Sequence, residues 1–347
     1  MTADSPFAAL VPYGWDDRVA ALYASTNPDP DPARHAPGRV IRIDYDRCVV
    51  TTGGASPLRA TAWPLPATGD WVRLVFTDDG TGTPPAVDEV LPRWSALARE
   101  EQVLAANVDI VLVMAALDRP LNLNRIEREL VMAWDSGAKP VVVLTKADTL
   151  DDPKQAVVAM EARAGGVDVV LTSSAHGSGV DEVADHLRPN RTAVLLGPSG
   201  VGKSTLVNRL LDAEVQATGR VREGDHKGRH TTTSRDLVLV PAGGVLIDTP
   251  GVRSLALGGA EEGLAAAFAD VGELAETCKF RDCRHDGEPG CAVTAAVAAG
   301  LLDGDRVANF RKIERDLERQ SASVLERAEQ ARKWKVVHKA MKKMPKG

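Results

Sequence analysis

The chain has 347 residues, which is long for a single hydrophobic core and favours two or three domains. Charged residues make up 26% and apolar residues 44%, so the composition excludes a wholly disordered chain. We also do not expect a membrane protein, because no apolar run in the sequence approaches the roughly eighteen residues that are needed to span a bilayer. The first residues, MTADSPFAAL, lack a secretory pattern, and we expect a cytoplasmic protein, by default a monomer.

The charge is unevenly distributed along the chain. Residues 332–347, RKWKVVHKAMKKMPKG, contain seven Lys and Arg and no acid, so the formal net charge of −6 leaves −13 for the rest. A basic tail on an acidic body is typical of nucleic-acid contact, and Trp334 could add stacking. A solvated terminus is an equally good reading of the tail.

The N-terminal third of the chain predicts a linker followed by a small barrel. Residues 1–36 are interpreted as an extension and linker because NPDPDPARHAPG is rich in Pro and Asp. Five short β-prone pieces follow within residues 37–95, namely RVIRI, CVVTT, LRATAW, DWVRLVF and AVDEVL. This pattern favours an oligonucleotide-binding (OB) barrel. Arg39, Arg42, Arg59 and Arg73 could line its binding face, unless they are simply solvated.

Residues 96–258 predict an α/β domain with a parallel sheet. The apolar strand VDIVLVMAAL, the helical pattern NLNRIERELVMAWDSG and the strand KPVVVLTKAD form one strand–helix–strand unit. VDVVLTSSAHGSG, DEVADHL and TAVLL continue the alternation, and DLVLVPAGGVLIDTPG reads as a hairpin that ends in a loop. From about residue 260 onward the chain is predicted to be helical.

A glycine loop between a strand and a helix predicts a phosphate site. GPSGVGKS, residues 197–204, fits the pattern G-x4-G-K-[ST]. Its N–H groups would converge on phosphate oxygens, Lys203 would reach the β and γ phosphates, and Ser204 would bind Mg²⁺. The expected binding residues are Gly197, Pro198, Ser199, Gly200, Val201, Gly202, Lys203, Ser204 and Thr205.

Two further loops are expected to complete the phosphate and Mg²⁺ site. In DTPG, residues 248–251, Asp248 would hold Mg²⁺ through water and the Gly251 N–H would meet the γ phosphate. In GRHTTTSRD we expect Thr232 to complete the Mg²⁺ shell, with Thr231 and Thr233 as alternatives.

The stretch LTKAD, residues 144–148, is similar to a guanine-reading loop but precedes the phosphate loop. Asp148 would accept two hydrogen bonds from guanine, and Lys146 would lie along the base. Thr145 stands where such loops usually have Asn. SSA at the next strand end, Ser173, Ser174 and Ala175, could direct the Ala175 N–H at the guanine carbonyl. Since loops at one sheet edge can be visited in any order, the pattern indicates a circular permutation.

The residue that would align the attacking water is not fixed by these motifs. Many such sites use a Gln directly after the glycine of the γ-phosphate loop, but this chain has Val252 there. Without help from a partner or another residue, hydrolysis at the γ phosphate should therefore be slow. His230 is a candidate to polarise the water, and a loop histidine that touches only RNA or solvent is the alternative.

Four potential metal ligands lie close together near the C-terminus. Cys278, Cys283, His285 and Cys291 give C-x4-C-x-H-x5-C, a set suited to one tetrahedral Zn²⁺. Four protein ligands leave no position for substrate, so we expect a structural site. Reactive thiols are the alternative.

With these motifs in this order, the chain from about residue 37 resembles the circularly permuted GTPases of small ribosomal subunit biogenesis, the RsgA or YjeQ family. The resemblance rests on TKAD, SSA, GPSGVGKS, GRHTTT, DTPGV and CKFRDCRHDGEPGCAV. It implies an OB barrel, a permuted P-loop GTPase domain, and a helical zinc-binding domain over residues 259–347. It also implies GTP and GDP as ligands, the small ribosomal subunit and its rRNA as partners, and hydrolysis stimulated by the subunit. A GTP-dependent switch acting on a protein effector is the alternative function.

Overall fold

The computed structural model describes residues 6–26, 31–77, 83–99, 102–212, 236–248 and 260–341, and only the backbone of residues 212, 248 and 323–341. The chain divides into two compact units, residues 1–255 and 256–347, and each is treated by itself. None of the helices within the described ranges is long and apolar enough to cross a bilayer.

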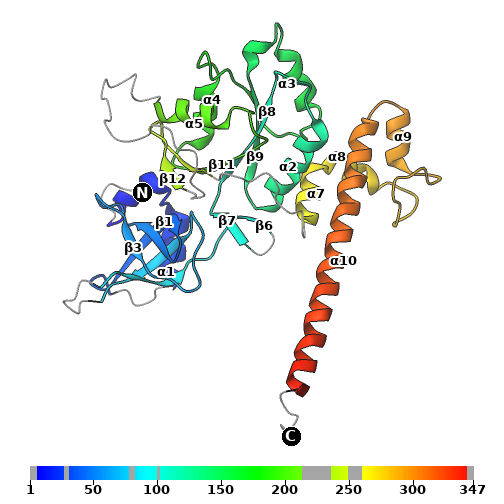
Figure 1. Cartoon of the computed structure of the whole chain (residues 1–347). Coiled ribbons are helices and arrows are strands. Elements are labelled where there is room, and N and C mark those ends of the chain that lie inside the picture. Colours follow the sequence, from blue (N-terminus) through cyan, green and yellow to red (C-terminus); the bar gives the residue numbers. More distant parts are fainter. Residues whose placement is uncertain are drawn as a thin grey trace. The chain divides into compact units, whose positions relative to one another are not determined.

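The first part of unit 1 is a small β-barrel (Figure 1). Its strands are β1 (His35–Asp44), β2 (Arg47–Thr51), β3 (Leu58–Ala60), β4 (Trp71–Val75) and β5 (Ala86–Val90). Strand β1 pairs antiparallel with β2 and β4, β2 pairs with β3, and β4 pairs with β5. A parallel bridge between Thr61 and Ala86 connects the end of β3 to β5 and closes the ring. The expected OB-type barrel is confirmed.

The barrel has its own apolar core and a cover formed by the N-terminal segment. Alternate side chains of the strands point inward and form this core, which consists of Val40, Cys48, Val50, Ala60, Val72 and Leu74. The 3₁₀ helix η1 (Ala8–Tyr13) and helix α1 (Asp17–Thr26) pack on the other side of β4. Trp15 meets Trp71 edge-on with ring centroids 5.3 Å apart, so an aromatic cluster attaches the N-terminal segment to the barrel.

The second part of unit 1 is a mostly parallel sheet flanked by helices. Its strands run in the order β10 (Val169–Leu171), β9 (Lys139–Thr145), β8 (Ile110–Ala116), β11 (Thr192–Leu196), β13 (Val245–Asp248) and β12 (Asp236–Leu239). Only β12 is antiparallel to its neighbour, as the predicted hairpin requires. Nearly every residue of β8, β9 and β11 is buried, which is why they read as continuous apolar runs.

Helices connect these strands and cover the sheet. They are α2 (Leu123–Asp135), α3 (Lys154–Glu161), α4 (Val180–Leu187) and α5 (Lys203–Asp212). Helix α2 begins at Asn122, whose Oδ1 accepts a hydrogen bond from the Arg125 N–H at 3.0 Å. Its apolar face buries Ile126, Leu130 and Val131.

A hairpin that the sequence did not suggest precedes the parallel sheet. Strands β6 (Ala96–Arg99) and β7 (Gln102–Ala106) pair antiparallel. The Ala106 N–H then donates to Thr68 O at 3.0 Å, which joins the hairpin to the barrel. The barrel also touches the sheet directly, because Arg42 of β1 pairs with Asp236 of β12.

Unit 2 is helical. It contains α7 (Glu261–Ala267), α8 (Ala269–Ala275), α9 (Ala292–Ala298) and the 38-residue α10 (Gly304–Met341). Arg306 of α10 is buried and donates to Asp270 of α8 at 2.7 and 2.8 Å, while its guanidinium lies 4.5 Å from the centroid of the Phe268 ring. This ion pair and ring contact connect α10 to the shorter helices.

Candidate functional site

The phosphate loop has the backbone that its sequence requires. Gly197, Gly200 and Gly202 all have positive φ, at 141°, 77° and 101°. At Gly197 a Cβ would also lie 2.8 Å from Met114 O of the neighbouring strand, so glycine is needed there for space as well as conformation. The loop leads from buried β11 directly into α5, where N–H groups converge at the helix start.

Lys203 stands at the first turn of α5 and bends back over the loop. Its Nζ donates to Gly197 O at 2.7 Å and to Pro198 O at 2.8 Å. Ser204 and Thr205 follow and are exposed. The ammonium group therefore lies beside the first two residues of the phosphate loop, and it could also contact an anion that the N–H groups of the loop bind.

The TKAD loop begins where buried β9 ends. Lys146 has a left-handed backbone, with φ of 58°, and its Nζ donates to Asp118 Oδ2 at 2.6 Å. Asp118, which follows β8, also binds Arg119 at 2.9 Å. Hydrogen bonds from Arg119 and then Lys146 hold the pKa of Asp118 below its ordinary value. The carboxylate thus stays charged and positions Lys146.

Thr145 connects the TKAD loop to the phosphate loop. Its hydroxyl lies 2.6 Å from Val201 O and 3.3 Å from Ala115 O, and the side chain is buried. A hydroxyl has one proton, and the shorter distance assigns it to Val201. At the position where such loops usually have Asn, the Thr145 hydroxyl thus links the TKAD loop to the phosphate loop.

Asp148 and the SSA loop are bonded to each other. The Ser173 hydroxyl donates to Asp148 Oδ1, and this bond is the largest cause that lowers the pKa of Asp148. The Ser173 Oγ also lies 3.1 Å from His176 Nδ1. Since β9 and β10 are parallel neighbours, their carboxyl ends place both loops at one edge of the sheet.

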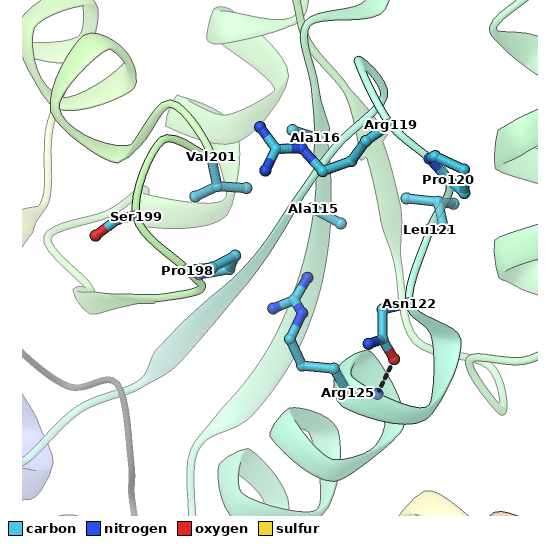
Figure 2. A pocket seen from close by; sticks show the side chains of 10 residues that line it. All are labelled: Ala115, Ala116, Arg119, Pro120, Leu121, Asn122, Arg125, Pro198, Ser199 and Val201. Atoms are coloured by element: carbon cyan, nitrogen blue, oxygen red, sulfur yellow. Dashed lines mark hydrogen bonds between the residues drawn. The ribbon is translucent and has the colours of Figure 1, made fainter.

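A cavity of about 70 Å³ lies beside the phosphate loop (Figure 2). Figure 2 shows the guanidinium groups of Arg119 and Arg125 between the phosphate loop and the segment through Pro120 and Leu121. Arg125 binds both oxygens of Glu129, at 2.7 and 2.8 Å, and burial raises the pKa of Glu129. The cavity is far smaller than a nucleotide pocket of several hundred Å³.

Several expected site residues lie outside the described residues. These are His230, the switch threonines Thr231, Thr232 and Thr233, and Gly251 and Val252 of the γ-phosphate loop. Asp248 is described by its backbone alone, at the end of β13. Because β13 is parallel to β11, Asp248 ends its strand at the same edge of the sheet as the phosphate loop.

The four expected metal ligands converge in unit 2, between α8 and α9. Their ligand atoms all lie within 4.8 Å of one another. Cys291 Sγ is 3.5 Å from His285 Nδ1 and 3.9 Å from Cys278 Sγ, and Cys291 also caps α9 by accepting from the Thr294 N–H. Ligands about 2.3 Å from a tetrahedral Zn²⁺ would be about 3.8 Å apart, so the donor set fits one zinc ion.

The barrel surface differs from expectation at Arg39. Arg39 is 1% exposed and lies in the interior, so it cannot line a binding face. Arg73 is mostly covered and pairs with Asp88 and Glu89 across the strands. Arg59 is well exposed, and two aromatic side chains project fully from the barrel, Tyr45 in the β1–β2 turn and Trp63 after β3. Tyr45 and Trp63 are thus more exposed on the barrel than Arg39, Arg59 and Arg73.

Sequence reasoning missed Asp118 and Arg209 at this site. Neither belongs to a local motif, and each acts on a loop that is distant in sequence: Asp118 on Lys146, and Arg209 of α5 on the carbonyls of Ser174 and Ala175. Only their places after a strand end and on the phosphate-loop helix could have pointed to them.

Comparisons with known proteins agree on one family. The sequence model of the RsgA GTPase matches residues 90–258. A protein of Streptomyces coelicolor named small ribosomal subunit biogenesis GTPase RsgA is 44% identical over 94% of this chain and 92% of its own length. A second protein, small ribosomal subunit biogenesis GTPase RsgA 2 of Lactiplantibacillus plantarum, is 40% identical over 81% of this chain and 80% of its own length.

Two solved structures have a similar fold. YjeQ from Thermotoga maritima aligns with a TM-score of 0.63 and 26% identity over 82% of this chain and 98% of its own. YloQ, described as a circularly permuted GTPase, aligns with a TM-score of 0.62 and 23% identity over 82% and 96%. The permuted order inferred from the motifs is therefore matched by a related fold.

Proposed function

The chain belongs to the RsgA family of circularly permuted GTPases and is a GTP hydrolase, and on that premise we propose that it assists late maturation of the small ribosomal subunit. The proposal is supported by the names of the relatives, whose sequences align with most of this chain. We further propose that the protein works in the cytoplasm, where it binds the subunit and its rRNA.

For the nucleotide, the supporting observation is that three motifs separated in sequence are tied together at one sheet edge. Thr145 binds the phosphate loop, and Ser173 binds Asp148. In our assignment Asp148 reads the guanine ring N–H and amine, and Lys146 lies along the base. Residues 197–205 bind the phosphates, and Lys203 leaves its two carbonyl partners for the β and γ phosphates.

For hydrolysis, the phosphate charge must be neutralised and a water aligned. Ser204, exposed at the start of α5, would bind Mg²⁺ together with Thr232 and Asp248. The Gly251 N–H would contact the γ phosphate. Because Val252 cannot orient water, turnover should be slow until the subunit assists, with His230 as the candidate to polarise the water. If His230→Ala kept full subunit-stimulated turnover, that role would be withdrawn.

Nucleotide state would reach unit 2 through the chain itself. The γ-phosphate loop runs within about thirty residues into the zinc ligands, so its rearrangement can act on them mechanically. We propose that GTP sets the arrangement that binds the subunit and that hydrolysis loosens it. Equal affinity for small subunits with GDP and with a non-hydrolysable GTP analogue would contradict this coupling.

The decisive experiment is GTP turnover with and without purified small subunits. We expect slow turnover alone and a large stimulation by small subunits, with large subunits as the matched control. Co-sedimentation over a range of salt concentrations then distinguishes RNA from protein contacts, since phosphate neutralisation weakens steeply with salt. Turnover that small subunits leave unchanged would favour a switch acting on a protein effector.

A further inference from the structure

One arginine holds two successive carbonyl groups of the SSA loop. Arg209 lies on α5, the helix that starts at the phosphate loop, and its Nε donates to Ser174 O at 2.8 Å. Its Nη2 donates to Ala175 O at 3.2 Å. A single guanidinium therefore joins the helix of the phosphate site to the loop that follows β10.

The bond to Ser174 O fixes the direction of the next N–H group. The Ser174 carbonyl and the Ala175 N–H belong to one planar trans peptide and point in opposite directions. When Arg209 holds the carbonyl, the Ala175 N–H must face away from α5. In the part of the chain that the structure describes, neither the Ser174 nor the Ala175 N–H has an acceptor. The loop thus keeps a directed donor available for a ligand.

The other half of the loop is fixed at Ser173. Its N–H donates to Ser178 O at 3.0 Å, and its hydroxyl donates to Asp148. A carboxylate acceptor and an N–H donor are therefore held on two bonded loops. Guanine presents the complementary groups, N–H donors at positions 1 and 2 and a carbonyl at position 6, whereas adenine has an amine at position 6.

We propose that Arg209 is a positioning residue for base selection, which holds the Ser174–Ala175 peptide so that the Ala175 N–H meets the guanine 6-carbonyl. The inference rests on the proposed base-reading role of Asp148. It adds a specific division of tasks: Asp148 reads the N–H groups of the base, and Arg209, acting through the peptide, sets the response to the carbonyl.

The test combines protein variants with ligands that are altered at one position of the base at a time. Dissociation constants are measured by calorimetry for GDP, for 6-thioguanosine diphosphate, which keeps the N1–H and the 2-amine but has a weakly accepting sulfur in place of the 6-carbonyl oxygen, and for IDP, which lacks the 2-amine. The proteins are the full-length wild type, Arg209→Ala, Arg209→Lys and Arg188→Ala. Arg188 is the matched control, since its Nε also donates to a loop carbonyl, Ala242 O at 2.9 Å, away from the base loops.

In the wild type, both analogues should bind more weakly than GDP. Arg209→Ala should weaken GDP binding about 10-fold, the equivalent of one neutral hydrogen bond, and should shrink the affinity penalty for replacing the 6-carbonyl oxygen with sulfur. The IDP penalty should stay unchanged. Arg209→Lys, with one ammonium still able to reach Ser174 O, should recover part of the penalty for the sulfur at position 6, and Arg188→Ala should match the wild type.

Two results would overturn the proposal in distinguishable ways. If Arg209→Ala keeps the wild-type penalty for the sulfur at position 6, Arg209 does not direct the donor, while the role of Asp148 stands. If the wild type binds all three nucleotides alike, the base-reading assignment itself fails, and the inference fails with it. Circular dichroism of each variant verifies that the fold is retained.

Discussion

At the scale of single residues, Thr145 shows how one departure from a motif is accommodated. Such loops usually have Asn at this position. The buried Thr145 hydroxyl links the TKAD loop to the phosphate loop, at 2.6 Å to Val201 O. The shorter side chain suffices because β9 and β8 bring the TKAD loop directly behind the phosphate loop.

Replacing Thr145 with Val should remove the link with little change in shape. Val keeps the branched side chain, but the buried Val201 carbonyl loses a donor, at a cost of about 1–3 kcal/mol. We expect GDP affinity to fall roughly 10-fold by calorimetry. Thr145→Ser, which keeps the hydroxyl, is the control and should bind GDP nearly as the wild type does. Unchanged affinity in Thr145→Val would show that the link is dispensable.

Candidate site residues can be proposed from the sequence where the chemistry that they serve is local. The phosphate loop, TKAD and the zinc ligands are contiguous patterns, and backbone sterics or ligand spacing dictate them. The contacts of Arg209, Asp118 and Arg39 depend on elements that lie far apart along the chain. Arg39 was read as a surface residue because alternation along β1 does not reveal which strand face is covered by another segment.

At the scale of elements, helix α2 is joined to the end of α3 by a buried ion pair. Arg163 Nε donates to Glu127 Oε1 at 2.9 Å, and the two side chains are 6% and 1% exposed. Removing one partner leaves a buried charge without compensation, which typically costs about 3–5 kcal/mol.

Glu127→Ala should therefore lower the free energy of unfolding by about that amount. The measurement is urea unfolding followed by intrinsic tryptophan fluorescence, to which Trp134 on α2 contributes. Glu127→Leu combined with Arg163→Met should recover much of the loss, because no unpaired charge remains. Lys139→Ala, which breaks the exposed pair with Asp168, is the matched control and should change little. A large effect of Lys139→Ala would contradict the role of burial.

The four proposed zinc ligands, Cys278, Cys283, His285 and Cys291, support a comparable prediction for unit 2. Helices α8 and α9 have seven residues each, too short to be stable alone, and Cys291 both caps α9 and belongs to the ligand set. Chelation should release one zinc per chain and reduce the far-ultraviolet helical signal, and Cys283→Ser should do the same. Cys48→Ser, which changes the barrel core instead, is the control and should retain the zinc bound in unit 2. Full helicity without metal would refute a structural role.

Elements with strong periodicity were predictable, and elements defined by partners were not. The five barrel strands and the alternation of the parallel sheet followed from apolar patterns and turn residues. The β6–β7 hairpin was missed because its residues, SALARE and QVLAA, have no turn signal and weak alternation. The N-terminal helix α1 exists because Trp15, Val19 and Tyr23 find Trp71, a contact that local propensity cannot foresee.

At the scale of the whole molecule, Arg39 connects three parts of unit 1. From β1 its guanidinium donates to Tyr13 O of the N-terminal segment, to Asn107 O at 3.3 Å after the hairpin, and to the Thr192 hydroxyl at 2.7 Å at the start of β11. Burial lowers the pKa of Arg39 to about 10, so the group stays charged at neutral pH. A charge buried in this way requires all its partners in place.

Arg39→Ala should consequently separate the motions of the barrel from those of the parallel sheet. The variant loses three hydrogen bonds at the junction and leaves buried acceptors without a donor, so the junction should open while β8, β9 and β11 keep their own core. Hydrogen exchange read by mass spectrometry should then rise in η1 and β1–β5 but not in the central sheet strands. Arg59→Ala, on β3 of the barrel and with a 69% exposed side chain, is the control and should leave exchange at the junction unchanged. Uniformly faster exchange in Arg39→Ala would mean that the arginine stabilises unit 1 as a whole, and the idea of a specific connection between barrel and GTPase would be wrong.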